Sequence, residues 1–257
     1  MKLTVVDAFT DCPFSGNPAA VTVLDAFPAD AAMQAVAREM NLSETSFVVP
    51  RADGEYDLRW FTPTVEVDLC GHATLAAAFL LGGSPVFHTR SGRLACRTDD
   101  GRVEMDFPAR PPVACPLAGR FPEGLPEAKW TGRAGEDWFV ELDGWADVVE
   151  ARPDPAGVVA LGGRALIVTA AGHGSEGDAD FVSRFFAPNA GIPEDPVTGS
   201  AHCALGPYWA ERLGRTRLTG YQASARGGTV TVEVQGERVR LGGRAVRVSE
   251  VTLLVQP

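Results

Sequence analysis

The sequence predicts an α+β fold of two similar halves, each a curved, mostly antiparallel sheet wrapped around a central helix. The first observation behind this is an internal repeat: residues 59–63 and 184–188 both read Arg, two aromatic residues, a small residue and Pro. Each copy then crosses an acidic loop and enters an Ala-rich segment through a glycine. The second observation is that short predicted strands lie on both sides of each Ala-rich segment. Two copies are too few for a solenoid, so we expect two domains that face each other across a site.

The two copies differ in length. Ten residues separate Phe61 from Gly71, whereas thirteen separate Phe186 from Gly199. The difference predicts a loop insertion of three residues in the second copy.

The first half reads as strands that flank two helices. Apolar residues at helical spacing, with Asp30 near the start, predict a helix over 28–40. A second helix begins at Gly71 and stops at Gly82-Gly83, because glycine past a helix end is a common stop signal. Strands are expected at 3–9, 19–24, 46–49, 56–61, 86–89, 94–97 and 103–107.

The second half begins after residues 108–116, a stretch with four prolines that marks the domain boundary. We therefore expect domains 1–112 and 113–257, with the last strand able to return to the first. Helices are expected near 155–161 and from Gly199 to Gly214. Strands are expected at 138–142, 166–170, 179–186, 218–223, 229–234, 238–241 and 245–255, with turns at Gly227-Gly228 and Gly242-Gly243.

Composition narrows the class of protein. The chain has 257 residues, a hydrophobic content of 45% and a net charge of −10. An acidic globular chain lacks the long-range field that attracts nucleic acid or an anionic membrane surface, so we expect neither as a partner. Five cysteines without paired spacing, and the lack of a targeting segment, predict free thiols in the cytoplasm. No phosphate-binding loop or zinc-finger spacing occurs, so we expect neither cofactor nor metal.

The glycine that opens each Ala-rich helix predicts an anion site. The first backbone N–H groups of a helix lack partners within it, and the helix dipole makes that end positive. Gly71 and Gly199 leave this end open to a negative ligand. The alternative is that both are buried helices that merely pack.

Four polar residues are candidates for chemistry. Glu44 lies between a helix and a strand, where partial desolvation would suit a general base; the alternative is a solvated loop residue. His72 follows Gly71, and the positive helix end should keep it neutral; the alternative is a core or capping histidine. Asp195 and Ser200 flank the start of the second helix, where ordinary capping is the alternative.

Cys70 raises the possibility of a racemase that uses two thiols. The repeat places Thr198 rather than a cysteine opposite Cys70, and Cys203 lies five residues further on. The sequence therefore does not support the two-thiol geometry. Because Cys70 precedes a helix, we expect it to favour the thiolate and to react faster than Cys203.

Four segments, ordered along nearly the whole chain, resemble the phenazine-biosynthesis isomerase (PhzF-like) family of the diaminopimelate-epimerase superfamily. They are Asp7-Ala8-Phe9 with Gly16-Asn17-Pro18, residues 41–47, residues 70–75 and residues 194–200. The resemblance implies two similar halves with the site in the cleft, a cofactor-free isomerase and a homodimer.

The resemblance also implies roles for individual residues. Glu44 would be the acid/base that moves a proton between carbons, with His72, Asp195 and Ser200 holding polar groups of the substrate. Gly71 and Gly199 would donate backbone hydrogen bonds to a carboxylate, with Asn17, Cys70 and Ala73 also around the substrate.

We therefore expect an isomerase that acts on a small carboxylate with Glu44 as its single acid/base. Two alternatives stay open at this point. One is a racemase or epimerase that uses Cys70, and the other is a protein that binds a small carboxylate without turning it over.

Overall fold

The structure is a computed structural model and describes residues 1–117, 121–172 and 179–254. The chain forms two compact units: Met1–Asp106 with Gly242–Pro257, and Phe107–Leu241. The last strand therefore begins in the second unit and ends in the first. Among the residues described, no helix is long and apolar enough to cross a membrane.

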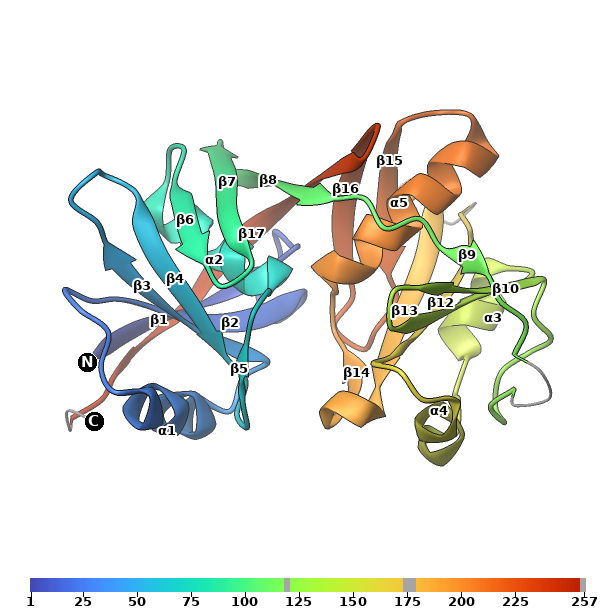
Figure 1. Cartoon of the computed structure of the whole chain (residues 1–257), viewed down its shortest axis with the longest axis horizontal. Coiled ribbons are helices and arrows are strands. Elements are labelled where there is room, and N and C mark those ends of the chain that lie inside the picture. The colour runs from blue at the N-terminus through green and yellow to red at the C-terminus, as the bar shows by residue number, and fades with distance from the viewer. Residues whose placement is uncertain (118–120, 173–178, 255–257) are drawn as a thin grey trace. The chain divides into compact units, whose positions relative to one another are not determined.

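The first unit holds most of its strands on one sheet, with one helix on each face (Figure 1). Its strands are β1 (Lys2–Ala8), β2 (Asn17–Val23), β3 (Glu44–Pro50), β4 (Tyr56–Phe61), β5 (Glu66–Val67), β6 (Val86–Thr89), β7 (Gly92–Asp99) and β8 (Arg102–Pro108). Its helices are α1 (Asp30–Met40) and α2 (Gly71–Leu81). Ser46 and Phe47 of β3 point to opposite faces, as neighbours on a strand do. Phe47 packs with α1, and the Ser46 hydroxyl donates to the carbonyl of Ala73 in α2.

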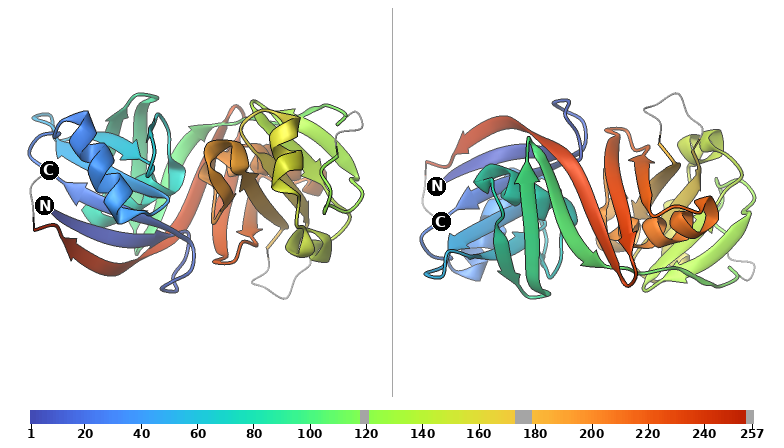
Figure 2. Two further views of the ribbon diagram at one scale, coloured as in Figure 1. Left: turned by 90° about the horizontal axis from the view of Figure 1, so that it is seen from below. Right: turned by 90° about the horizontal axis from the view of Figure 1, so that it is seen from above.

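The second unit repeats this plan with two extra short helices. Its strands are β9 (Val113–Ala114), β10 (Trp130–Ala134), β11 (Asp137–Glu141), β12 (Leu166–Ala171), β13 (Phe181–Ala187), β14 (Ile192–Asp195), β15 (Arg217–Gln222), β16 (Gly228–Gln235) and the start of β17 (Arg238–Thr252). Its helices are α3 (Trp145–Glu150), α4 (Pro155–Leu161), the 3-10 helix η1 (Pro188–Ala190) and α5 (Gly199–Leu213). Figure 2 shows α5 and the strands of this unit from two further sides.

The strand pairings show that the two units share one topology. In the first unit, β2–β3 is parallel, β3–β4 antiparallel, β4–β6 parallel and β6–β7 antiparallel. In the second unit, β11–β12, β12–β13, β13–β15 and β15–β16 follow the same series of directions. The prediction of an α+β fold with two similar halves is confirmed.

The central helix of each unit is mostly apolar and buried on all sides, except for the exposed last turn of α5, which is the pattern of a core helix. In α2, every residue from His72 to Ala78 is buried. The small side chains of its alanines let the strands approach closely. In α5, the contact is closer still at Gly206, where a Cβ atom would lie 2.5 Å from Cγ1 of Val232. Both helices are buried, as the alternative to an anion site predicted, but their first turns also carry the polar groups described in the next subsection.

Pro207 lies inside α5 and cannot donate the backbone hydrogen bond that the carbonyl of Cys203 would otherwise accept. That carbonyl instead accepts from the backbone N–H of Arg110, at 2.8 Å. The Pro-rich segment after β8 thus satisfies a buried helix carbonyl. This contact explains why the segment lies along α5 in the second unit.

The repeated Arg makes the same ion pair in both units. Arg59 donates from Nε and Nη2 to the carboxylate of Glu66, with both distances 2.7 Å. Arg184 donates in the same way to Glu194, at 2.7 and 2.8 Å. The acid lies seven residues after the first Arg and ten after the second, and the three-residue η1 accounts for the difference. The insertion expected from the sequence is therefore this 3-10 turn.

The prediction of a turn at Gly242-Gly243 is wrong. The chain runs through both glycines as part of β17, a single strand of 15 residues. A Cβ atom on Gly243 would lie 2.4 Å from Cδ1 of Phe9 and 3.2 Å from Cδ1 of Leu75. Glycine is needed here so that the strand can pass close to the core, because no side chain would fit.

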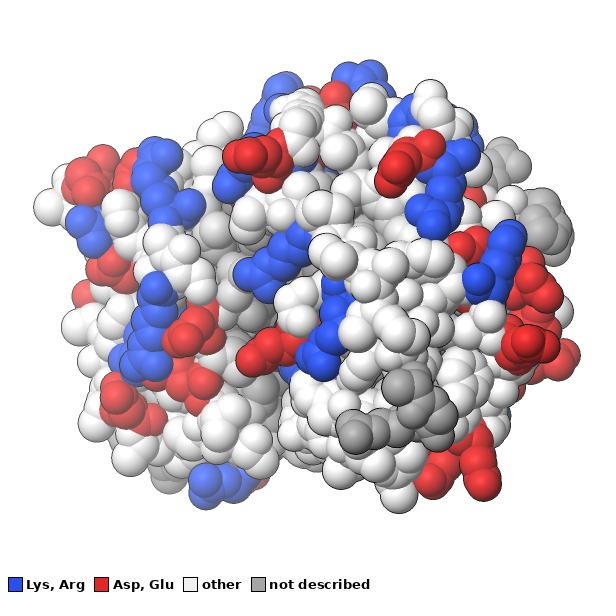
Figure 3. All heavy atoms as spheres, turned by 45° about the vertical axis from the view of Figure 1, so that its right-hand side comes forward, with Lys and Arg blue, Asp and Glu red and all other residues white. Residues whose placement is uncertain are grey.

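Acidic and basic side chains are interspersed on the face shown in Figure 3. Many arginines of the described residues form ion pairs with acidic side chains, for example Arg51 with Asp57 and Arg215 with Asp180.

Candidate functional site

The junction after α1 places Glu44 at the first residue of β3. The helix ends at Met40, and Asn41 reverses the chain in the left-handed conformation, with φ 49°. Asn adopts this conformation more readily than most residues. Glu44 then lies beside Ala19 of β2 in the parallel ladder, and its side chain is only 12% exposed. The alternative of a solvated loop residue is therefore wrong.

His72 and Asn17 meet Glu44 inside the first unit. His72 is in the first turn of α2, and its Nε2 lies 2.8 Å from Oε2 of Glu44. Its Nδ1 lies 3.1 Å from Nδ2 of Asn17, the fully buried first residue of β2. Among the described residues, neither Glu44 Oε2 nor His72 Nε2 has a further hydrogen-bond partner. Three predicted residues from β2, β3 and α2 are therefore brought into one buried cluster.

Cys70 completes this cluster but is not the reactive thiolate that we expected. It is the residue before α2, and its Sγ lies 3.5 Å from Nδ1 of His72. Burial raises the pKa of the Cys70 thiol to about 11, the charge of Glu44 adds to the increase, and His72 opposes it only in part. A helix end favours a thiolate only where the thiol is accessible and free of a neighbouring carboxylate. The prediction of a thiolate is therefore wrong.

The prediction of a neutral His72 is wrong as well. Burial by itself lowers the pKa of His72, but the charges of Cys70 and Glu44 and the hydrogen bonds to them raise the pKa well above 6.5. Because Cys70 keeps its proton to about pH 11, Glu44 is the partner that matters near neutrality. A carboxylate at 2.8 Å outweighs the positive end of the helix.

The charge of His72 decides which way the amide of Asn17 points. In the protonated ring both nitrogens are donors, so Asn17 must present Oδ1 to Nδ1. In the neutral ring Nδ1 can accept from the Asn17 amide nitrogen, as the 3.1 Å contact is drawn. Asn17 can therefore serve both states of the ring by a rotation of its amide.

The same residues have ligand atoms that a metal ion could use. Glu44, Cys70 and His72 offer three such atoms within 4.8 Å of one another. Binding there would have to displace the thiol and imidazole protons, at a cost set by their raised pKa values. A second group, Asp53, Glu55 and His88, is more exposed, and its carboxylates already pair with arginines. The expectation that no metal is needed stays a prediction.

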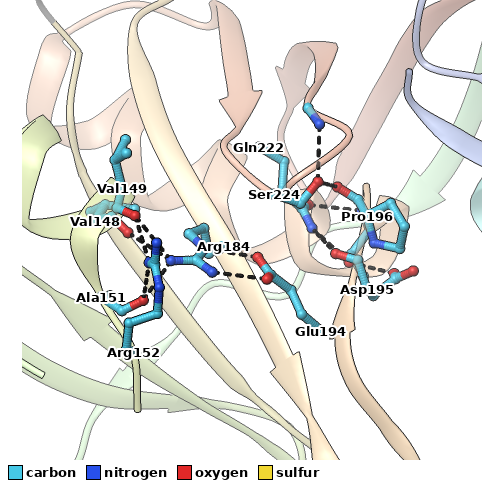
Figure 4. Close-up of polar contacts among 12 residues, drawn as sticks. Val148, Val149, Ala151, Arg152, Arg184, Glu194, Asp195, Pro196, Gln222 and Ser224 are labelled. Atoms are coloured by element: carbon cyan, nitrogen blue, oxygen red, sulfur yellow. Dashed lines mark hydrogen bonds and ion pairs between the residues drawn. The ribbon is translucent and has the colours of Figure 1, made fainter. Parts of the chain in front are cut away.

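In the second unit, a network of side chains holds the loop that carries Asp195 (Figure 4). The Thr198 hydroxyl donates to Oδ2 of Asp195 at 2.5 Å, and the Thr198 backbone N–H donates to Oε1 of Gln222 at 2.8 Å. The amide nitrogen of Gln222 donates to the Asp195 carbonyl at 2.7 Å, and the Ser224 hydroxyl donates to the Pro196 carbonyl at 2.7 Å. Asp195 is therefore held from both its side chain and its backbone.

Arg184 fixes the strand that leads into this loop. Besides its pair with Glu194, its Nη1 donates to the carbonyls of Val149 and Ala151 at the end of α3, at 3.1 and 2.5 Å (Figure 4). These carbonyls have no partners within the short helix, and a buried cation is a strong donor to them. The repeat's Arg thus ties β14 to β13 and to α3.

The N-terminus of α5 is uncapped, contrary to the alternative of ordinary capping. Thr198 is the residue before the helix, and no side chain caps the first turn. Ser200 instead accepts a hydrogen bond from Nη2 of Arg164 at 3.0 Å. Arg164 also donates from Nε and Nη2 to both oxygens of Asp137, at 2.8 and 2.5 Å. An arginine therefore stands at this helix entry, where we expected backbone donors alone.

The two helix entries are otherwise alike. Gly71 and Gly199 are the first residues of α2 and α5, and neither helix has a side-chain cap. Cys70 and Thr198 are the preceding residues, both in extended conformation. Ala73, two residues after Gly71 in the first turn of α2, is fully buried. Thr198 thus has the same place before α5 that Cys70 has before α2.

The family model described as "Phenazine biosynthesis-like protein" matches residues 6–251. The chain belongs to this family. An uncharacterised isomerase of Pseudomonas aeruginosa is 50% identical, over 98% of this chain and 99% of its own length. The mouse phenazine biosynthesis-like domain-containing protein 2 is 36% identical, over 98% and 99%. The family assignment and these relatives support the isomerase class predicted from the sequence.

Solved structures of the family have the same fold. A phenazine biosynthesis protein of the PhzF family from Enterococcus faecalis is 42% identical, with a TM-score of 0.91 and coverage of 97% of each chain. A hydroxyproline epimerase from Agrobacterium vitis is 12% identical, with a TM-score of 0.60 and coverage of 98% of this chain and 91% of its own. At 12% identity, the similarity to the hydroxyproline epimerase shows only that the two proteins share a fold.

Sequence reasoning missed three polar residues of the second unit. Asp137, Arg164 and Gln222 lie far apart in the sequence, on or beside three different strands, and none is in the repeated motif. Gly162-Gly163 before Arg164 signalled a turn, but nothing local indicated that the turn would bring a guanidinium to Ser200. Only the strand pairing brings these side chains to the helix entry.

Proposed function

We propose that the chain is a cofactor-independent isomerase that moves a proton between two carbons of a small carboxylate, with Glu44 as general acid/base. The observation that carries the proposal is the buried contact of Glu44 with His72, at 2.8 Å. A proton shift between carbons needs one group that takes the proton and returns it elsewhere. Family membership and relatives named as isomerases support this reaction class.

The surroundings of Glu44 suit a base that must also act as an acid. His72 Nε2 lies 2.8 Å from Oε2 of Glu44, so a protonated ring can donate to the carboxylate while Glu44 takes a proton from carbon. The carbon keeps the bonding electron pair, which moves into a neighbouring double bond and shifts it by one position. The resulting carboxylic acid then returns the proton to the other end of the system, so the composition of the substrate does not change. Asn17 steadies the imidazole throughout, because its amide can face either state of Nδ1.

A racemase that uses Cys70 is the second candidate, because its Sγ lies 3.5 Å from His72 Nδ1. Two observations weigh against it. The pKa of the thiol is raised to about 11, so little thiolate is present near neutrality. Thr198 occupies the matching place before α5, and a hydroxyl is a far weaker base than a thiolate.

Hydrogen exchange with D2O separates these functions. Proton transfer makes an acidic C–H of a substrate exchange with solvent, which 1H NMR detects. Suitable probes are small β,γ-unsaturated acids, beginning with 3-butenoate, whose allylic C–H is acidified from both sides. We expect Glu44→Gln to lower the exchange rate by about a hundredfold or more, the usual scale for a lost general acid/base.

Two further variants serve as comparisons in the same assay. Glu39→Gln removes an exposed carboxylate from the end of α1 and should leave exchange unchanged. Cys70→Ser should also retain most of the exchange, since the thiol is not the base. Exchange that survives Glu44→Gln and is lost in Cys70→Ser would establish the racemase. Binding of the probes without exchange by the wild-type protein would establish a non-catalytic binding protein.

A further inference from the structure

One nucleophilic group of the first unit has no task in the proposed reaction. The Cys70 thiol is buried before α2, and its Sγ lies 3.5 Å from Nδ1 of His72. The proposed proton shift uses the carboxylate of Glu44 and does not need this thiol. A thiolate and an imidazole side by side are typical ligands of zinc, which raises the question whether a metal ion binds here.

The distance between these two ligand atoms suits one zinc ion. Zinc bonds to a thiolate at about 2.3 Å and to an imidazole nitrogen at about 2.0 Å, so two such ligands of a tetrahedral ion lie about 3.5 Å apart. Sγ of Cys70 and Nδ1 of His72 have this separation. The ion would replace the hydrogen bond between them, and neither side chain would have to move far.

Glu44 supplies the partner that a metal-bound histidine needs. Such a histidine almost always donates its other ring N–H to a carboxylate, a carbonyl or water, which fixes the ring and its tautomer. Nε2 of His72 lies 2.8 Å from Oε2 of Glu44, so Nδ1 is the nitrogen that is left for the metal. The Glu44 carboxylate and a Cys70 thiolate together carry two negative charges, which balance the charge of Zn²⁺.

The ligand types define which metal fits. Thiolate and imidazole ligands suit zinc, whereas Mg²⁺ and Ca²⁺ take sets of oxygen ligands. Zinc would replace the proton of the Cys70 thiol and the proton on Nδ1 of His72, and both protons would pass to solvent. The bonds of zinc to sulfur and nitrogen have to offset this loss, and a hard cation forms no such bonds. We therefore expect Zn²⁺ to bind and Mg²⁺ not to bind.

We infer that Sγ of Cys70 and Nδ1 of His72 bind zinc, with Glu44 holding the other ring nitrogen, and that zinc reversibly inhibits the enzyme. The inhibition rests on the proposed function, whereas the binding does not. A divalent cation beside Glu44 favours the ionised carboxylate and so makes it a weaker base. Zinc is an inhibitor in this inference, so the expectation of a reaction without a cofactor is unaffected.

Titration calorimetry with ZnCl2 on the full chain tests the binding, with MgCl2 as the comparison. Cys70→Ser should weaken zinc binding by about a hundredfold, because it removes a ligand. Glu44→Gln should weaken it by about tenfold, the usual loss when the partner of a metal-bound histidine is removed.

Two control variants should keep the affinity of the wild type. Cys12→Ser removes an exposed thiol outside the cluster. His88→Gln removes the imidazole from the other group of possible metal ligands, Asp53, Glu55 and His88.

Cobalt reports the ligands directly. Co²⁺ bound to a thiolate absorbs in the near ultraviolet by charge transfer from sulfur, which a change of structure alone would not produce. The wild type and both control variants should show this band, and Cys70→Ser should not. If Cys70→Ser does not fold, iodoacetamide labelling of the wild type decides, because zinc should slow the labelling of Cys70 and leave that of Cys12 unchanged.

Four results would overturn the zinc site. They are equal zinc affinity in Cys70→Ser and the wild type, no thiolate band with cobalt in the wild type, loss of the site in His88→Gln, and Mg²⁺ that binds as tightly as Zn²⁺. Loss in His88→Gln would assign the metal to the second group of ligands.

Hydrogen exchange of the 3-butenoate probe in D2O separates the inhibition from the proposed function. Zinc should stop the exchange in proportion to the occupancy of the site, and EDTA should restore it. Zinc bound at Cys70 with full exchange would overturn the inhibition and leave the binding site. Exchange that depends on Glu44, in a protein that binds no zinc, would keep the isomerase and remove the zinc site. If the wild type does not exchange the probe, the proposed function fails, and calorimetry and cobalt still decide the metal site.

Discussion

His202 should make the second unit labile to acid. The ring lies in α5 and is fully buried, with Nδ1 2.8 Å from the carbonyl of Thr198. Nδ1 must therefore carry the proton and donate it. Nε2 has no partner among the described residues, and the ring of Phe181 lies 5.8 Å away, centre to centre. A second proton on Nε2 would be a buried cation without an acceptor.

The size of the effect follows from the pKa of the ring. Burial lowers the pKa of His202 from 6.5 to about 4, and the hydrogen bond to Thr198 offsets only part of this. Between these values the unfolded chain binds a proton that the folded chain does not, so stability falls as the pH falls from 6.5 to 4. At about 1.4 kcal/mol per pH unit, the difference amounts to about 3 kcal/mol, most of it already lost at pH 4.5.

Urea unfolding followed by tryptophan fluorescence measures this loss, since Trp130, Trp138, Trp145 and Trp209 lie in the second unit and only Trp60 lies in the first. His202→Gln keeps a donor for the Thr198 carbonyl but does not titrate. We expect the wild type to lose about 2–3 kcal/mol more than His202→Gln between pH 7 and pH 4.5. His88→Gln, which removes a partly exposed histidine of the first unit, should follow the wild type in this signal.

An equal pH dependence of the wild type and His202→Gln would refute the reasoning. It would mean that the folded protein accepts the proton, by water or by movement of α5. A wild type that is stabilised by acid would show that the sign is wrong and that His202 has an anionic neighbour.

The other two predictions concern the repeated Arg and the cysteines. Arg184→Gln should destabilise the second unit by about 3–5 kcal/mol, because the 7% exposed Arg184 is the donor to Glu194 and its loss leaves the carbonyls of Val149 and Ala151 with Arg152 alone. Arg59→Gln should cost the first unit about 1–2 kcal/mol, because Arg90 still pairs with Glu66 and the other partner, Asp30, is 72% exposed. Hydrogen exchange measured by mass spectrometry reports the stability of each unit separately. Equal losses of stability in the two variants would contradict the argument that Arg184 is the more buried and less replaceable donor. Iodoacetamide should label exposed Cys12 first and Cys70, Cys96 and Cys203 slowly, since burial raises the pKa of these three thiols to about 11 or 12. Labelling of Cys70 at the rate of Cys12 would show that its thiol is accessible.

The sequence alone revealed the internal repeat and the residues at which the central helices begin and end, because both depend on local chemistry. Gly71 with Gly82 and Gly199 with Gly214 bound α2 and α5 as predicted, since a helix end needs a residue that tolerates an unusual backbone. The expectation of an α+β fold followed from that repeat and from the strand pattern. The identity of Glu44 and His72 as candidates also came from position alone, beside a helix end.

The ionisation of these residues and their partners depended on tertiary structure. A helix dipole argument predicted a neutral His72 and a Cys70 thiolate, and both predictions were wrong. Burial, with the charge of Glu44 added, keeps the proton on Cys70, and Glu44 of β3 approaches His72 closely enough to favour the charged ring. Gly243 was read as a turn because a sequence does not show that Phe9 lies against it. The pairing of β11 and β12 brings Arg164 beside Asp137, and only the folded chain brings Ser200 of α5 to the same guanidinium. Local sequence determines where elements begin and end, but electrostatic energies depend on distance in space, and only the folded chain sets those distances.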